Sequence, residues 1–308
     1  MTDLSIISTN LTDNYNHIIN DWLTDIEVSK NTSIAYQKGI NKYIEYLLSN
    51  NLESSKQSII GFKNELIKEY SNATAYIYIA SIKSFYKYLS KIYYISDIAS
   101  DVKLPKISKG FKRDCLAIDQ LSLLFNLLNE NNIVNLRDKV MINLFVRCGL
   151  RTCELKNINV EDISTINGQK ILYIKGKGHI EKDEYVILTD FMMNLINKYL
   201  LQRKNYIDKS PLFISHSNRT SGKRLDNSTI RFICKKYLKQ VNNSPKISTH
   251  SFRHTAITIS ILAGSNLIDI KDFARHSSID TTLKYVHNLK RIENAPELKI
   301  DEFLNGSI

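Results

Sequence analysis

The chain has 308 residues with 42 Lys or Arg and 31 Asp or Glu, which give a net charge of +11 and a pI of about 9.3. Its 43% hydrophobic residues, 10 Gly and 4 Pro are typical of one large or two ordinary globular domains, and they exclude a disordered or fibrous chain. No stretch approaches the roughly 18 uninterrupted apolar residues of a membrane span, and the N-terminus lacks the apolar core of a signal peptide, so we expect a cytoplasmic protein without a membrane partner.

The first part of the chain, residues 14–96, has apolar residues at helical spacing in four successive stripes. Short polar breaks separate the stripes, and Ser29 and Thr32 supply cap signals before the second stripe. The stripes consist of Ile18, Ile19, Trp22, Leu23 and Ile26; Ile34, Ile40, Ile44, Leu47 and Leu48; Ile59, Ile60, Phe62, Leu66 and Ile67; and Tyr76, Ile77, Ala80, Phe85, Tyr86 and Leu89. They predict a small helical bundle, and we assign residues 1–100 to a first domain.

Residues 101–114, DVKLPKISKGFKRD, combine several basic side chains with one Pro and one Gly and show little periodicity. This pattern predicts an extended, basic linker between two domains. In a DNA-binding protein such a segment would lie along phosphates; otherwise it is a solvated connection.

After the linker, the sequence contains both helical and strand-like patterns of apolar residues. Helices are predicted after Asp119 and over residues 136–148. Gly149 follows the second of these, where a glycine can take the left-handed conformation that closes a helix.

One clear strand–turn–strand passage covers residues 171–188, where β-branched and aromatic residues surround Gly176 and Gly178. Helical patterns then resume over residues 190–204, 226–241, 249–263, 267–275 and 279–287. A short amphipathic segment follows Pro296. The sequence therefore predicts a mainly α second half with a small β-sheet.

Basic residues are concentrated in the second part of the chain. Residues 1–110 carry 12 basic and 11 acidic side chains, whereas residues 111–308 carry 30 and 20. This asymmetry favours an anionic partner, and for a cytosolic chain nucleic acid is the commonest one.

The four cysteines, Cys115, Cys148, Cys153 and Cys234, form no CxxC pair and have no histidine at metal-ligand spacing. No GxxxxGK[ST] loop is present, nor a GxGxxG sequence after a strand. We therefore expect reduced thiols, no metal site and no cofactor.

Three passages in the basic half carry chemistry: GLRTCEL (149–155), HSFRH (250–254) and ARHSSIDTTLKYVH (274–287). Each alone is a weak signal, but together they supply what phosphodiester transfer requires. Negative charge develops on the non-bridging oxygens, and the forked guanidiniums of Arg151 and Arg253 suit it. His250 lies on the same helical face as Arg253, three residues away, so both can reach one phosphate.

The last of these passages also contains a nucleophile of suitable chemistry. Tyr285 follows His276 by nine residues, and His276 can donate a further hydrogen bond to the phosphate. A phenol has an ordinary pKa near 10, so it needs proton removal and nearby cations to attack at neutral pH. A lysine in the turn over residues 175–182 can protonate the leaving 5′ oxygen.

Taken together, these motifs resemble the tyrosine recombinases, or phage-integrase family, in order and spacing, most closely the compact Xer-like members and short transposon integrases. The resemblance implies a SAM-like four-helix core-binding domain over residues 1–100, joined by the basic linker to a tyrosine-recombinase catalytic domain over residues 115–290. SKNTSIAYQKGINKYIEYL resembles the opening helices of the core-binding domain.

The resemblance also implies residue roles. Arg151 corresponds to the first catalytic arginine, and Lys177, in Gly176-Lys177-Gly178, to the β-hairpin lysine. His250 and Arg253 correspond to the H-x-x-R pair. Lys175 lies in the same hairpin, so the choice of general acid between Lys175 and Lys177 stays open.

By the same resemblance His276 is the later histidine and Tyr285 the nucleophile. Glu154 and His254 match supporting positions beside the arginines, where they would orient other groups rather than react. Attack by Tyr285 would give a 3′-phosphotyrosyl link and a free 5′ hydroxyl, and strand exchange would pass through a Holliday junction. This chemistry needs neither a metal nor a nucleotide cofactor.

The resemblance further implies partners: double-stranded DNA with an inverted-repeat core site, and a homo-tetramer on synapsed DNA. Residues 291–308 form a tail that is expected to dock on a neighbouring protomer, the alternative being a helix that caps its own domain. Whether a partner recombinase or an accessory factor is required stays open, as does the choice between mobile-element integration or excision and Xer-like dimer resolution.

One motif departs from the family pattern: the common Leu-Gly-His is Ala274-Arg275-His276 here, and Arg275 can add a phosphate contact. Two other functions are compatible with the chemistry. A type IB topoisomerase would relax supercoils by similar steps, although the four-helix N-terminal part and the H-x-x-R…H…Y spacing favour a recombinase. A non-catalytic DNA-binding relative would lack a reactive residue type, and none is missing.

Overall fold

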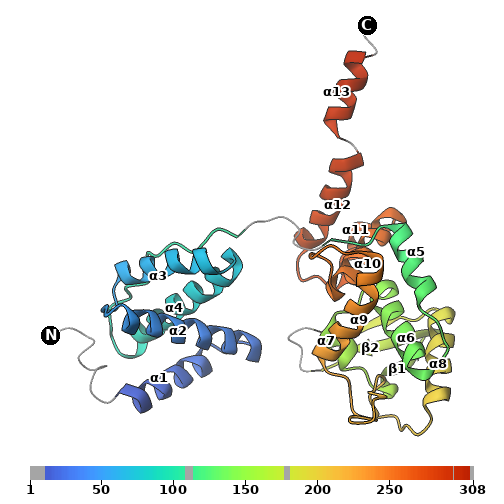
Figure 1. Cartoon of the computed structure of the whole chain (residues 1–308), viewed down its shortest axis with the longest axis horizontal. Helices are drawn as coiled ribbons and strands as arrows, with labels where there is room; N and C mark the ends of the chain where they lie inside the picture. The colour runs from blue at the N-terminus through green and yellow to red at the C-terminus, as the bar shows by residue number, and fades with distance from the viewer. Residues whose placement is uncertain (1–10, 108–113, 177–180, 294, 306–308) are drawn as a thin grey trace. The chain divides into compact units, whose positions relative to one another are not determined.

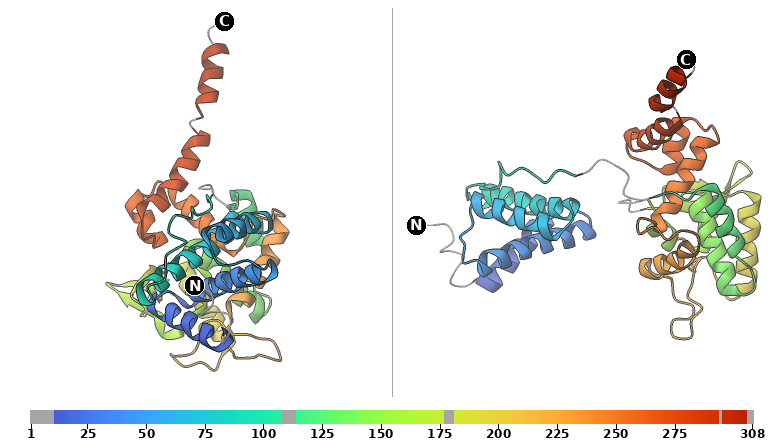
Figure 2. Two further views of the ribbon diagram at one scale, coloured as in Figure 1. Left: turned by 90° about the vertical axis from the view of Figure 1, so that its left-hand side faces the viewer. Right: turned by 45° about the horizontal axis from the view of Figure 1, so that its top comes forward.

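The computed structural model describes residues 11–107, 114–176, 181–293 and 295–305 (Figures 1 and 2). The chain divides into two compact units, residues 1–110 and 111–308. No helix in the described ranges is long and apolar enough to cross a membrane.

The first unit is the predicted helical bundle. Its described helices are α1 (Leu11–Asp25), α2 (Lys30–Ser49), α3 (Lys56–Glu69) and α4 (Asn72–Ile92). Serine hydroxyls at positions 29, 55 and 71 accept hydrogen bonds from the first turns of α2, α3 and α4, which fixes where these helices begin. The fully buried Trp22 anchors the core against Tyr36 and Phe85.

The second unit is mainly helical and carries a small sheet, as predicted. Its helices are α5 (Ile118–Leu127), α6 (Ile133–Arg147), α7 (Thr152–Lys156), the 3-10 turn η1 (Val160–Asp162), α8 (Asp190–Arg203), α9 (Asn227–Val241), α10 (Thr249–Leu262), α11 (Leu267–Ala274), α12 (Ile279–Glu293) and α13 (Pro296–Asn305). Helix α6 is buried along most of its length between α8 and α10, so it is the central helix of this core.

The sheet is an antiparallel meander of β1 (Ile163–Ile166), β2 (Gln169–Ile174) and β3 (Glu184–Ile187). Leu172 is buried and lies opposite both Ile163 and Val186, which sets the register. The strand–turn–strand prediction is confirmed for β2 and β3. Strand β1 was not predicted, because its four residues are half-buried or exposed and lack a marked apolar alternation.

Candidate active site

The turn between α6 and α7 is the structural centre of the site. Gly149 follows α6 with φ +58°, and a Cβ at this position would lie 3.0 Å from the ring of Phe273. Glycine is therefore required both for the left-handed backbone and for the close approach of α11. The Gly149 carbonyl accepts hydrogen bonds from Arg253 Nη1 (2.5 Å) and Arg275 Nη2 (2.9 Å).

Arg151, which is half-buried, forms an ion pair with the fully buried Glu154 across the first turn of α7. Arg151 Nη1 lies 2.6 Å from Glu154 Oε1, and the Arg151 amide donates to Glu154 Oε2 at 2.7 Å. Burial alone would raise the pKa of Glu154, but the guanidiniums of Arg275 and Arg151 and the Arg151 amide hold that pKa below its ordinary value. Glu154 is thus a fixed anion that orients Arg151.

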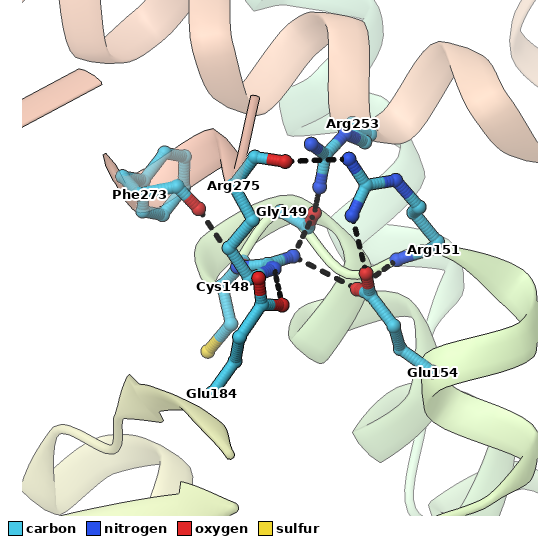
Figure 3. A network of polar contacts seen from close by, with 8 residues as sticks. All are labelled: Cys148, Gly149, Arg151, Glu154, Glu184, Arg253, Phe273 and Arg275. Carbon is cyan, nitrogen blue, oxygen red and sulfur yellow. Dashed lines mark hydrogen bonds and ion pairs between the residues drawn. The ribbon is translucent and has the colours of Figure 1, made fainter. Parts of the chain in front are cut away.

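Arg253 extends from α10 toward the same turn and is 2% exposed (Figure 3). Its Nη2 is buried without a hydrogen-bond partner among the described residues. Burial and the positive charges of Arg151 and Arg275 lower the pKa of Arg253 to about 9, so the group remains cationic at neutral pH. A buried guanidinium beside two others, with an unused donor, has the charge and the hydrogen-bonding capacity to bind an anion such as a phosphate.

Tyr285 lies on α12 and is 7% exposed. Its hydroxyl is 2.7 Å from Nδ1 of His254, whose ring packs edge-on against His250. Burial raises the pKa of Tyr285 to about 12, and the neighbouring Arg253 acts in the opposite direction. The phenol is therefore protonated at neutral pH in this state, with His254 beside its proton.

His276 completes the group. Its ring stacks on Tyr285 at 6.3 Å, and its Nδ1 hydrogen-bonds with the hydroxyl of the buried Thr282 at 2.9 Å. Burial, followed by the charges of Arg253, Arg151 and Arg275, lowers the pKa of His276 to about 4. The imidazole is consequently neutral at pH 7 and can donate a hydrogen bond from one ring nitrogen.

The predicted hairpin lysine Lys177 lies outside the described residues. Lys175 is described: it follows the end of β2 and is half-buried. Beyond the turn, Lys182 forms an ion pair with the buried Asp162 at 2.6 Å, which fastens the hairpin to η1.

The structure thus brings together side chains from the start of α7, from α10 and α12, and from the α11–α12 turn: Arg151, Glu154, Arg253, His254, His276 and Tyr285. His250 is exposed at the start of α10 and joins them through His254. Two further residues belong to this group. Thr282 gives no sequence signal. Arg275 was expected to add a phosphate contact, but its guanidinium is buried against Glu154.

Family models match most of the described chain. The model of the phage integrase family matches residues 115–291, and that of the phage integrase N-terminal SAM-like domain matches residues 19–91. These matches cover the basic half and the helical bundle separately.

Curated relatives extend over nearly the full length. A tyrosine recombinase XerC of Thermodesulfovibrio yellowstonii is 27% identical over 285 residues, which are 87% of this chain and 91% of that protein. A tyrosine recombinase XerD of Staphylococcus epidermidis is 28% identical over 289 residues, 88% of this chain and 94% of that protein.

Solved structures share the fold. XerH recombinase bound to its palindromic difH substrate, in a post-cleavage complex, has a TM-score of 0.71 at 21% identity, covering 86% of this chain and 78% of that chain. A lambda integrase tetramer bound to a Holliday junction has a TM-score of 0.63 at 15% identity, covering 86% and 77%.

The fold and the relatives together define a tyrosine-type site-specific DNA recombinase, an enzyme that breaks and rejoins DNA strands. The relatives' names favour this function over relaxation by a type IB topoisomerase. Since the family model matches more than half of its residues, the chain belongs to the phage integrase family.

Proposed function

We propose that Tyr285 of this recombinase attacks the scissile phosphate of a double-stranded, inverted-repeat core site. The phenol oxygen bonds to phosphorus, the bond to the 5′ oxygen breaks, and the leaving oxygen takes up a proton to become a 5′ hydroxyl. A 5′ hydroxyl of the partner duplex then displaces the tyrosine, which completes strand exchange through a Holliday junction.

One observation carries this proposal: a buried phenol, a neutral imidazole and two arginines from separate elements converge on one site. Arg151 and Arg253 would hold the non-bridging oxygens, and Arg253 Nη2 supplies a donor without a partner among the described residues. His250 and His276 would add hydrogen bonds to the same phosphate. The sequence predicted an orienting role for His254, but its hydrogen bond with the Tyr285 hydroxyl favours a different one, in which His254 would accept the proton of Tyr285.

The hairpin would supply the proton for the leaving oxygen, from Lys177 or from Lys175. Lys175 directly follows β2, whose last residue, Ile174, pairs with Glu184, and Glu184 Oε2 lies 3.9 Å from Arg275 Nε. Replacing each lysine by Met, on a substrate whose 5′ oxygen is replaced by sulfur, identifies the acid, because a thiolate leaves without protonation. If the sulfur-containing substrate restores cleavage by one lysine variant and not by the other, the lysine replaced in the restored variant is the general acid.

We also propose the division of labour along the chain. Residues 1–100 would form the core-binding domain, residues 101–114 a linker along phosphates, and residues 115–290 the catalytic domain that closes on DNA in the cytoplasm. Two compact units, each matched by its own family model, support this division.

The tail over residues 291–308 would dock on a neighbouring protomer of a DNA-bound tetramer. Support comes from α13, which has no buried residue and keeps Leu298, Ile300 and Leu304 57–60% exposed. Changing Ile300 and Leu304 to Asp should preserve binding of one protomer to a half-site and abolish the tetramer in native electrophoresis. A tetramer that survives this double change, as it should survive Lys299→Asp, would favour a helix that caps its own domain.

The decisive experiment isolates detergent-resistant protein–DNA adducts. The purified chain is incubated with fragments flanking its own gene and with random genomic fragments, and the attached DNA is sequenced. Adducts should converge on one inverted-repeat sequence and should disappear with Tyr285→Phe. Sites at the ends of a mobile element indicate integration or excision, whereas a single chromosomal site indicates dimer resolution.

Other outcomes would overturn parts of the proposal. Adducts that depend on Tyr285 but scatter over all DNA would indicate topoisomerase-like relaxation. Adducts that persist in Tyr285→Phe would exclude this nucleophile. DNA binding that is unaffected by Arg151→Ala and Tyr285→Phe, without adducts even after addition of a cell extract that supplies partner recombinases and accessory factors, would indicate a non-catalytic relative.

A further inference from the structure

Arg275 occupies a backbone position that suits glycine. It ends helix α11 with φ 49° and ψ 51°, the left-handed conformation, and it directly precedes His276. A Cβ makes this conformation unfavourable, and arginine is not among the residues that visit it readily. The contacts that the Arg275 side chain makes act against this cost.

The guanidinium of Arg275 makes those contacts inward. It is 5% exposed, and it donates to the carbonyls of Phe273 (2.7 Å) and Gly149 (2.9 Å) and to Glu154 Oε2 (2.9 Å) (Figure 3). Its Nε lies 3.9 Å from Glu184 Oε2, an ion pair too long to be a hydrogen bond. The side chain consequently joins the α6–α7 turn, α7, α11 and the first residue of β3.

Arg275 acts on Arg151 in two ways, through its side chain and through its backbone. Glu154 receives Arg275 on Oε2 and Arg151 on Oε1, so the fully buried carboxylate is fixed between two guanidiniums. In addition, Arg151 Nη2 donates to the backbone carbonyl of Arg275 at 2.8 Å. Arg151 is thus held by the main chain of Arg275 directly and by its side chain through Glu154.

We propose that Arg275 is a positioning residue, which fixes Glu154 and thereby the orientation in which Arg151 receives the scissile phosphate, and which links this site to strand β3 through Glu184. The role of the site rests on the proposed function, whereas the positioning is testable without DNA. The geometry assigns Arg275 to the frame of the site rather than to the phosphate, since Nη1 and Nη2 donate to protein oxygens and Nε lies 3.9 Å from Glu184 Oε2.

The test compares Arg275→Gly and Arg275→Lys with the unchanged protein. Glycine accepts the left-handed backbone, so it removes the side chain without adding strain. Adduct formation at saturating DNA should slow on the order of 100-fold in Arg275→Gly, since a small misplacement of a positioning group has effects of this size. DNA affinity should remain nearly unchanged, and Arg275→Lys should recover part of the rate.

A second measurement needs no reaction. The titration of Glu154, followed by carboxyl ¹³C NMR, should shift to higher pH in Arg275→Gly, because burial then acts on a carboxylate with one guanidinium instead of two. The acid limb of the pH–rate profile should shift in the same direction. If the unchanged protein forms no adducts, the proposed function fails, while this titration still decides the positioning role.

Lys204→Gly is the matched control, since Lys204 is an exposed helix-ending residue with φ 54°. It should change neither the rate nor the titration. An adduct rate and a Glu154 midpoint in Arg275→Gly equal to those of the control would overturn the proposal. If Arg275→Gly does not fold, Arg275→Lys decides the question. A full rate of adduct formation together with an unshifted Glu154 midpoint in this variant would exclude the need for a forked donor.

Glu184→Gln tests the link to β3. It should slow adduct formation without moving the Glu154 midpoint, and an unchanged rate would exclude the link.

Discussion

At the scale of single residues, the contact between Tyr285 and His254 gives a first prediction. Replacing His254 by Ala removes a hydrogen bond from a buried hydroxyl, so the free energy of unfolding should fall by about 1–3 kcal/mol and adduct formation should slow. In His254→Asn the side-chain amide can stand in for Nδ1, so this variant should be closer to the unchanged protein. Urea unfolding and adduct kinetics measure both effects; equal loss in the two variants would contradict a role for this hydrogen bond.

His276 gives a second prediction at this scale, concerning pH. Its pKa is lowered to about 4 in the folded chain, against an ordinary value of 6.5, so between these values the unfolded chain binds more protons. The contribution of the neutral His276 to the free energy of unfolding is therefore fully present above pH 6.5, and it should be lost as the pH falls toward 4. His276→Gln should reduce this loss in thermal unfolding, whereas His287→Gln, at an exposed position on the same helix, should not. Parallel curves for all three proteins would contradict the buried, neutral state of His276.

At the scale of elements, Gly149 lies in the turn between α6 and α7, where α11 packs against it. Alanine there would take an unfavourable left-handed backbone and place its Cβ 3.0 Å from the Phe273 ring, so Gly149→Ala should cost about 2–4 kcal/mol in urea unfolding. Gly222→Ala isolates the backbone effect, because its φ is +78° and no atom lies within 4 Å of the added Cβ. A similar loss in both variants would mean that the close approach of Phe273 does not matter.

The same scale shows what the sequence can and cannot predict. Helices α1–α6 and α8–α12 follow from apolar stripes and caps, because helical spacing marks the buried face directly. Strand β1 and the five-residue α7 could not be predicted in this way, because they are too short to show a periodic pattern of apolar residues. The clustering of Arg151, Arg253 and Tyr285 could be anticipated only from motif order and chemistry. The inward turn of Arg275 could not, because it depends on which oxygens the folded chain presents to one guanidinium.

At the scale of the whole molecule, the uneven distribution of charge determines how the chain should bind DNA. Residues 111–308 carry 30 basic against 20 acidic side chains, while residues 1–110 are nearly balanced, so most phosphate neutralisation should come from the second unit. Affinity for a site-bearing duplex should fall by roughly a thousandfold or more between 50 and 200 mM salt, because bound phosphates release condensed counterions. Tyr285→Phe removes no charge and should keep the same log–log slope, whereas Arg151→Ala removes the phosphate contact proposed for Arg151 and should reduce the slope by about one. Fluorescence anisotropy over this salt range measures the slopes, and a flat response in the unchanged protein would rule out DNA binding that depends mainly on phosphate contacts.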